Sequence, residues 1–148
     1  MRFRYQQWSI KDPAFPHERF LWQPVVQVQL SDPTQRHPMK SRRFEAFIDS
    51  GAVRCFFDAS IGRAIGLNVQ GGLKGQLGGI VSATRCDVFY HDVNLHIAGE
   101  VGRIAAGFAE GLDVAGVLGR RGFFDQFIVT FDHSVTPPEI ELTRIARP

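Results

Sequence analysis

The sequence has few cysteines, no long hydrophobic run and almost no excess of charge. Its 148 residues include two cysteines, too few for the disulfide framework on which small secreted domains depend. No apolar run approaches the roughly 18 residues that a membrane-spanning helix needs, and residues 1–16 lack the apolar stretch of a signal peptide. We therefore expect a cytoplasmic protein with reduced thiols and no membrane partner.

Intrinsic disorder is excluded by the composition, because it needs low hydrophobicity together with a high net charge. Here 44% of the residues are hydrophobic, 22% are charged, and the formal net charge is only +2. A chain of this length can bury a core as one domain. No internal repeat or linker divides it, and we expect an N-terminal extension (residues 1–22) ahead of one domain (residues 23–148).

The small net charge hides a difference between the two parts of the chain. Residues 1–43 hold eight Lys or Arg and three Asp or Glu, whereas residues 44–148 hold nine and twelve. The basic residues of the first part are scattered singly, except that Lys40, Arg42 and Arg43 lie close together. A solvated surface explains this pattern better than a nucleic-acid site, for which basic residues would cluster.

Hydrophobic and polar residues alternate along much of the chain, which is the period of strands with one buried face. The alternating runs, bounded by Asp-Pro, Gly-Gly and Pro-Pro, are residues 26–30, 44–48, 88–97, 127–131 and 140–145. The thirteen phenylalanines suit strands as well. Short alternating runs of this kind predict a mainly β, mainly antiparallel fold.

Two segments depart from the strand period. Residues 58–67 have apolar residues near helical spacing, with Asp58 as the N-cap and Gly66 as the terminator. Gly62 weakens this helix, so it should be short. Residues 122–127 suggest a second short helical turn before the last strands. We therefore expect one or two short helices.

The segment FEAFIDSGA, residues 44–52, is the sharpest local signal of a functional site. Its alternating strand ends at Asp49, which places a carboxylate where the chain leaves the core. Ser50 supplies a hydroxyl that can brace neighbouring loops, and Gly51 permits close approach of the backbone. Taken alone, Asp-Ser-Gly is more often a simple β-turn, so the interpretation depends on the rest of the chain.

Two later segments support a functional interpretation. Residues 71–85 (GGLKGQLGGIVSATR) are rich in glycine, and residues 114–132 (VAGVLGRRGFFDQFIVTFD) place two apolar residues before Gly119. With the DSGA segment, this ordered set resembles the retropepsin-like family of aspartic proteases, which retroviruses use and which has cellular forms, over residues 23–132. The resemblance implies a single-lobed, closed barrel-like sheet. It also implies an endopeptidase that cleaves a peptide or protein substrate without a cofactor or metal.

In the family, the active-site loop carries the catalytic aspartate, and by resemblance Asp49 takes that role. Ser50, Gly51 and Ala52 match the rest of the loop. Two carboxylates about 3 Å apart cannot both ionise, so one draws a proton from water while the other polarises the peptide carbonyl. The chain holds one Asp-Ser-Gly. An active enzyme of this type is therefore a homodimer with Asp49 of both copies on the two-fold axis.

The resemblance also assigns roles outside this loop. The turn of a glycine-tipped flap is matched by Gly75, Gly78 and Gly79. Gly119 and Arg120 match the Gly-Arg of some viral members, in which an extra acid after DSGA pairs with the arginine. Val53 stands at that position here. The resemblance therefore does not identify the partner of Arg120, nor the residues through which two copies would contact each other.

Other chemically capable residues are weaker candidates. His91 and His96 lie five apart in an expected strand, so they face opposite ways and are poorly placed to share a metal. Cys55 and Cys86 lack CxxC spacing and are interpreted as small hydrophobic residues. The glycines of residues 71–79 lack the GxxxxGK[ST] pattern of phosphate-binding loops. A catalytically inactive module of the same fold that binds a peptide or protein is the alternative function.

Overall fold

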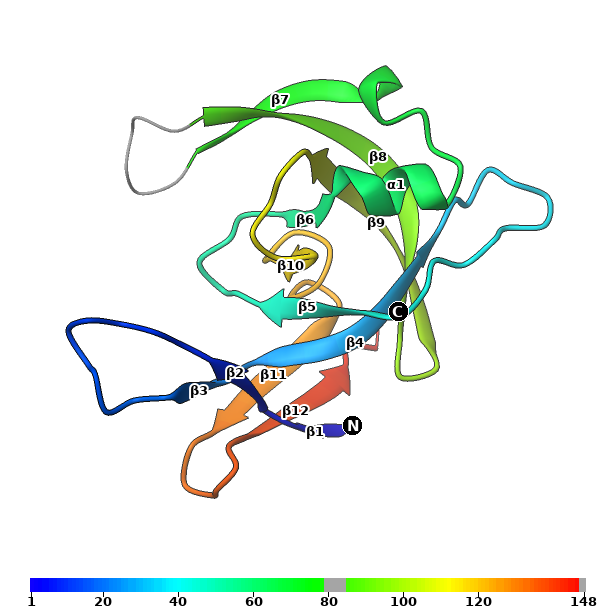
Figure 1. The fold of residues 1–148 in the computed structure, drawn as a ribbon. Coiled ribbons are helices and arrows are strands. Elements are labelled where there is room, and N and C mark those ends of the chain that lie inside the picture. Colours follow the sequence, from blue (N-terminus) through cyan, green and yellow to red (C-terminus); the bar gives the residue numbers. More distant parts are fainter. Residues whose placement is uncertain (79–84, 147–148) are drawn as a thin grey trace.

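The computed structural model describes residues 1–78 and 85–146, and it is mainly β (Figure 1). The described elements are β1 (Arg2–Arg4), β2 (Gln6–Ser9), β3 (Phe20–Gln23), β4 (Val25–Ser31), β5 (Phe44–Ile48), β6 (Cys55–Asp58), α1 (Ala59–Ala64), the 3-10 helix η1 (Val69–Gly71), β7 (Leu73–Gly78), β8 (Arg85–Ile97), β9 (Glu100–Ala109), β10 (Gly116–Leu118), β11 (Phe127–Asp132) and β12 (Glu139–Arg144). The mainly β fold expected from the sequence is confirmed. None of the described helices is long and apolar enough to cross a membrane.

One seven-stranded sheet makes the body of the molecule. Its strand order is β4-β5-β10-β6-β9-β8-β7, and a further pairing of β4 with β8 closes the first six of these strands into a barrel. β7 lies outside this ring and pairs with β8 alone among the described strands. The single-lobed closed sheet that the sequence predicted is therefore present.

The barrel interior is filled from alternate positions of its strands. In β4, Val26, Val28 and Leu30 are buried, whereas Gln27 between them is exposed. Side chains point alternately to the two faces of a strand, so this pattern puts one face of β4 in the core. The largest fully buried side chains of the core include Phe57, Phe108 and Phe123.

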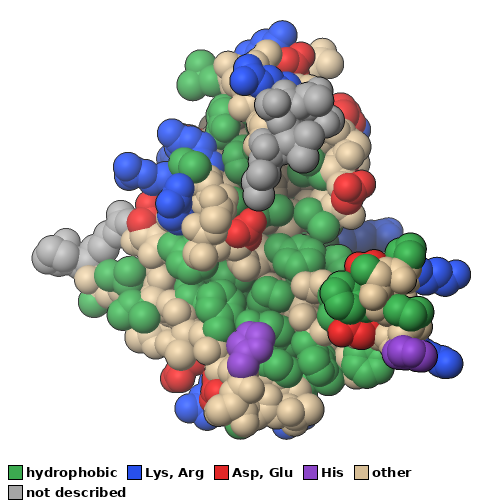
Figure 2. Space-filling view, turned by 90° about the vertical axis from the view of Figure 1, so that its left-hand side faces the viewer, with side chains coloured by type: hydrophobic (Ala, Val, Ile, Leu, Met, Phe, Trp, Pro, Cys, Tyr) green, Lys and Arg blue, Asp and Glu red, His purple; other side chains and the backbone are tan. Residues whose placement is uncertain are grey.

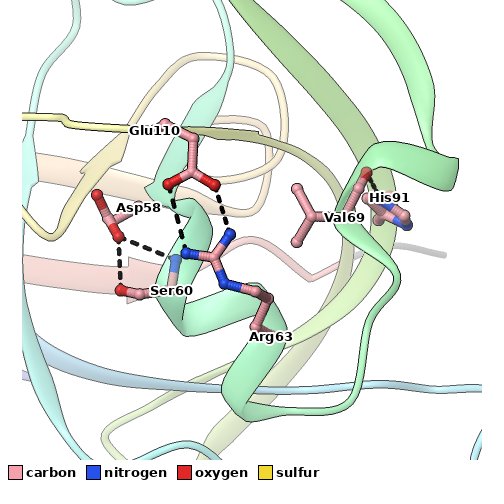
Figure 3. A network of polar contacts seen from close by, with 6 residues as sticks. All are labelled: Asp58, Ser60, Arg63, Val69, His91 and Glu110. Carbon is pink, nitrogen blue, oxygen red and sulfur yellow. Dashed lines mark hydrogen bonds and ion pairs between the residues drawn. The ribbon is translucent and has the colours of Figure 1, made fainter.

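The helix predicted at residues 58–67 is confirmed as α1, and its N-cap is Asp58 (Figure 3). The Asp58 carboxylate accepts a hydrogen bond from the Ser60 N–H at 2.9 Å. Gly66, at φ +88°, follows the helix in a left-handed conformation that glycine adopts without strain. Arg63 forms an ion pair with Glu110, just beyond β9, and thereby fastens the helix to the barrel (Figure 3).

Replacing Asp58 with alanine is expected to lower the free energy of unfolding by about 1 kcal/mol at neutral pH, because the helix loses its cap. Burial opposes ionisation of this carboxyl, but hydrogen bonds from Ser60 and Leu112 outweigh it and hold its pKa below the ordinary value. The carboxylate therefore stabilises the fold at neutral pH. Its contribution fades as the pH falls below about 4, towards the lowered pKa.

Urea unfolding at pH 7 and pH 3 measures this effect. Asp113→Ala is the matched control, because the exposed Asp113 side chain makes no hydrogen bond or ion pair within the described residues. If Asp58→Ala lowered the free energy of unfolding by the same amount at both pH values, the role of the ionised cap would be contradicted.

The second helical turn expected at residues 122–127 is not a helix. Gly122 has φ +106°, a value outside the α-helical region. The segment forms successive turns instead, in which the Phe127 N–H donates to the Phe123 carbonyl at 3.0 Å. This compact connection leads from β10 into β11.

Candidate active site

Asp49 directly follows β5. In the sheet, β10 lies between β5 and β6. β10 runs parallel to β5, with Leu118 opposite Ile48, and antiparallel to β6, with Val117 opposite Phe56. The Asp49 N–H donates to the Leu118 carbonyl at 3.0 Å. Residues 49–54 therefore cross the end of β10 on their way from β5 to β6, and the closed barrel fixes both ends of this loop.

Backbone hydrogen bonds fix the interior of this loop as well. The Asp49 carboxylate accepts from the Gly51 N–H at 2.8 Å, and the Asp49 carbonyl accepts from the Ala52 N–H at 3.2 Å. The Ala52 carbonyl in turn accepts from the Arg120 N–H at 2.9 Å. Asp49 and Ser50 are exposed. The result is a carboxylate held at the surface on a fixed turn.

Gly119 has a steric reason to be glycine. A Cβ at this position would lie 2.6 Å from the Arg54 carbonyl carbon and 2.8 Å from the Ala52 carbonyl oxygen. Both are backbone atoms of the Asp49 loop, and carbon atoms do not approach backbone atoms so closely without a shift of the chain. The sequence singled out Asp49 and Gly119 separately, and the structure places them in one packed unit.

The glycine-rich segment forms part of a hairpin that extends over this side of the barrel. Gly75 and Gly78 lie within β7, paired with Val88 and Arg85 of β8, while Gly79 lies outside the described residues. The hairpin and the loop after β5 extend toward the same side of the molecule (Figure 1).

A small apolar cluster, separate from the main core, lies between the hairpin and the barrel. Its buried members are Phe56, Val88 and Ala109, and Leu77, Cys86, Tyr90 and Leu112 pack against them. The Arg54 guanidinium lies 5.6 Å from the centre of the Tyr90 ring, so the Asp49 loop contacts the base of the hairpin. Figure 2, which faces this side, shows many hydrophobic side chains at the surface. The cluster packs the hairpin against the barrel.

The exposed arginines around the loop make no ion pair within the described residues. Val53 is exposed, and Arg120 makes no ion pair within the described part of the chain. Arg54 and Arg121 are exposed as well and likewise make no ion pair there. Ser50 makes no side-chain hydrogen bond within the same residues. The Ser50 hydroxyl and the Arg120 and Arg121 guanidinium groups are therefore without hydrogen-bond or ion-pair partners among the described residues.

The two histidines of β8 serve the fold. The His91 ring nitrogen Nε2 lies 2.7 Å from the Val69 carbonyl (Figure 3), and the corresponding atom of His96 lies 2.8 Å from the Ser31 hydroxyl. The two rings thus bind different elements, η1 and β4. The described residues contain no group of three or more His, Cys, Asp or Glu side chains that could hold a metal ion.

Both cysteines are free thiols. Cys55 is buried beneath the Asp49 loop, 3.6 Å from the Arg121 carbonyl. Desolvation by burial raises the pKa of its thiol to about 12. A thiol with this pKa is protonated at neutral pH and is a poor nucleophile. Cys55 therefore packs as a small hydrophobic residue, as the sequence predicted.

The difference in burial between the cysteines predicts different reactivity. In the native protein at pH 7.5, Cys86, which is half-buried, is expected to react with a thiol reagent, whereas Cys55 reacts only on unfolding. A time course with a chromogenic disulfide, read as thiols released in the absence and presence of denaturant, measures this. Equal rates for both native thiols would contradict the assignment.

Sequence reasoning did not connect the N-terminal segment with this site. The Pro24 carbonyl accepts a hydrogen bond from the Ile48 N–H at 2.9 Å, so the chain just after β3 runs beside the end of β5. The Trp8 ring packs edge-on against Phe47 with 4.8 Å between the ring centres. The two tryptophans near the N-terminus were the available signal, because aromatic residues in a polar segment indicate packing onto a surface.

The chain was compared with known sequences and structures. No protein-family model and no curated protein matches it. Among solved structures, the EIAV protease complexed with an inhibitor is similar at a TM-score of 0.45 and 18% sequence identity, over 66% of this chain and 82% of that chain. At this identity the likeness transfers no residue's role.

Proposed function

We propose that this chain is an aspartic endopeptidase of the retropepsin-like type, in which two copies of Asp49 activate a water molecule. The observation that carries the proposal is the position of Asp49. It is an exposed carboxylate on a loop fixed by backbone hydrogen bonds to Leu118 and Arg120. The loop extends toward the same side of the molecule as the β7–β8 hairpin (Figure 1), whose apolar residues pack against the barrel. A fixed acid beside a hairpin with apolar residues suits hydrolysis of a bound peptide.

The chemistry follows from two carboxylates that share one proton. The ionised Asp49 takes a proton from water as the oxygen attacks the peptide carbonyl, and the protonated Asp49 donates to the carbonyl oxygen. Collapse of the tetrahedral intermediate then breaks the C–N bond, with a proton passing to the leaving amine. The Ser50 hydroxyl is available to brace the two loops across the axis.

The substrate is an extended peptide lying between the hairpin and the Asp49 loop. β7 has an unpaired edge among the described strands, and extended peptides bind strand edges through backbone hydrogen bonds. Apolar side chains of the peptide would pack on partly buried residues of the hairpin, which include Leu77 and Tyr90. We therefore expect cleavage next to apolar residues.

Cleavage of a peptide library tests the proposal, read by mass spectrometry with the mass of the protein measured in the same solution. A dimer that cleaves next to apolar residues supports it. A stable monomer that binds peptides and cleaves none favours the second candidate, the inactive binding module. The observation behind that candidate is that Arg120 lacks the acid with which the viral members pair it, because Val53 takes that place.

A further inference from the structure

The hairpin formed by β2 and β3 is joined to the rest of the chain by its tryptophans, Trp8 and Trp22, and not by strand pairing. Its strands pair with each other and with no other described strand, and an isolated two-stranded hairpin is marginally stable in water. Every residue from 11 to 21 is exposed. Three of them are large and apolar: Phe15 is 57%, Phe20 48% and Leu21 41% exposed. Apolar residues gathered on a protruding element indicate a contact surface.

This hairpin stands beside Asp49. Val25 pairs with Phe47 in antiparallel β4 and β5, so β4 begins where β5 ends. The hairpin precedes that point of β4 and the Asp49 loop follows that point of β5. Both extend toward the same side of the molecule (Figure 1). A second copy brought close to Asp49 therefore arrives next to the hairpin.

The tip of the hairpin combines an open hollow with charged residues of both signs. Residues 9–19 surround an open hollow of about 760 Å³ that Ile10, Pro13 and Pro16 help to line. Its rim carries two cations and two anions, namely Lys11, Arg19, Asp12 and Glu18. None of the four forms an ion pair within the described residues. Two such rims related by a two-fold axis can set each cation against an anion.

We propose that the β2–β3 hairpin is a dimerisation arm that packs against a second copy of this chain. Phe15, Phe20 and Leu21 become buried in that contact, which brings the two Asp49 loops together. The inference rests on the proposed function, since one copy supplies half of the carboxylate pair. The arm provides a contact between the copies that does not depend on an acid at position 53.

A second exposed apolar residue, Ile128, lies on the sheet of β1, β12 and β11 and is 59% exposed. In that sheet β12 pairs with β1 on one side and with β11 on the other. Ile128 of this sheet, together with Val101 of β9, supplies the control for the arm.

Sedimentation velocity over a range of protein concentrations tests the arm with three variants. They are Phe20→Ser/Leu21→Ser, Phe15→Ser alone, and the control Val101→Ser/Ile128→Ser, which removes two apolar side chains elsewhere that are more exposed than Phe20 and Leu21. We expect the first to raise the dimer dissociation constant at least about 30-fold, the second about 10-fold, and the control less than about 2-fold. Phe15 lies in the tip loop, so its replacement leaves β2 and β3 paired. Circular dichroism checks the fold of each variant.

Peptide cleavage in the same samples separates the two proposals. An arm variant that stays dimeric, or a control that dissociates instead, overturns the arm and leaves the protease standing if cleavage persists. A wild-type dimer that dissociates on arm mutation but cleaves no peptide keeps the arm and overturns the protease. A wild-type protein that is monomeric at all concentrations, including one whose arm binds a different protein, overturns the arm as a contact between copies.

Discussion

Replacing Asp49 with asparagine is expected to abolish peptide cleavage while the fold and the dimer mass persist. The amide can neither take a proton from water nor donate one to the carbonyl as an acid. The substitution in a homodimer removes both members of the pair at once. General acid and base catalysis each contribute typically 10²–10⁴-fold, so we expect a loss of about 10⁴-fold or more.

The same substitution should cost little stability. Asp49 is exposed, and its Oδ1 accepts one hydrogen bond, from the Gly51 N–H at 2.8 Å. The amide oxygen of asparagine can accept that bond in the same geometry. Substitutions at exposed positions of this kind usually change the free energy of unfolding by no more than about 0.5 kcal/mol. Loss of activity without loss of structure would therefore separate catalysis from folding.

The measurement is library cleavage by the wild-type protein and Asp49→Asn from about pH 4 to about pH 8. Wild-type activity should peak in mildly acidic solution, where the carboxylate pair holds one proton. Asp92→Asn is the matched control, because Asp92 is an exposed carboxylate of β8 that pairs with Arg103 at 3.0 Å. Equal cleavage by wild type and Asp49→Asn would assign the activity to a contaminant or to another site.

The strands that the sequence predicted are those in which apolar and polar residues alternate, whereas β6, whose consecutive residues Cys55, Phe56 and Phe57 are all buried, shows no alternation and was missed. β4 alternates Val26, Val28 and Leu30 with glutamines, and the pattern can be read directly. β9 was missed because several of its buried positions carry small residues, among them Gly102 and Ala106. Such residues satisfy the packing of a closed barrel without giving an apolar period.

The candidate site depends on features of two kinds, some local in the sequence and some formed by contacts between distant residues. The strand-to-loop change at Asp49 is local, so the sequence shows it. The pairing of β4 with β8 that closes the barrel joins residues far apart in the chain, with Leu30 opposite Leu95. The position of the β2–β3 hairpin beside Asp49 likewise depends on the tertiary contact of Trp8 with Phe47. The tryptophans indicate that the N-terminal segment packs on the body, but no local pattern in a single sequence identifies the partner residue in either contact.

Gly119→Ala is expected to be the most destabilising single methyl group added to this site. Its Cβ would meet the backbone of Arg54 and Ala52, which cannot rotate away as a side chain would. Overpacking of this kind costs about 3 kcal/mol, which for a chain of this size lowers the melting temperature by about 10 °C. Where the fold survives, the displaced loop should lower cleavage as well.

Gly78→Ala is the matched control for the added methyl group. The nearest described atom to a Cβ there is Cγ of Arg85 at 4.0 Å, an ordinary van der Waals distance. Its free energy of unfolding should stay within about 0.5 kcal/mol of wild type. Thermal and urea unfolding of the two variants side by side measure the difference. If Gly119→Ala were as stable as Gly78→Ala, the contact between Gly119 and the Asp49 loop could not be what fixes the carboxylate in place. A loop that moves aside for a methyl group at no cost would not hold Asp49 on the two-fold axis.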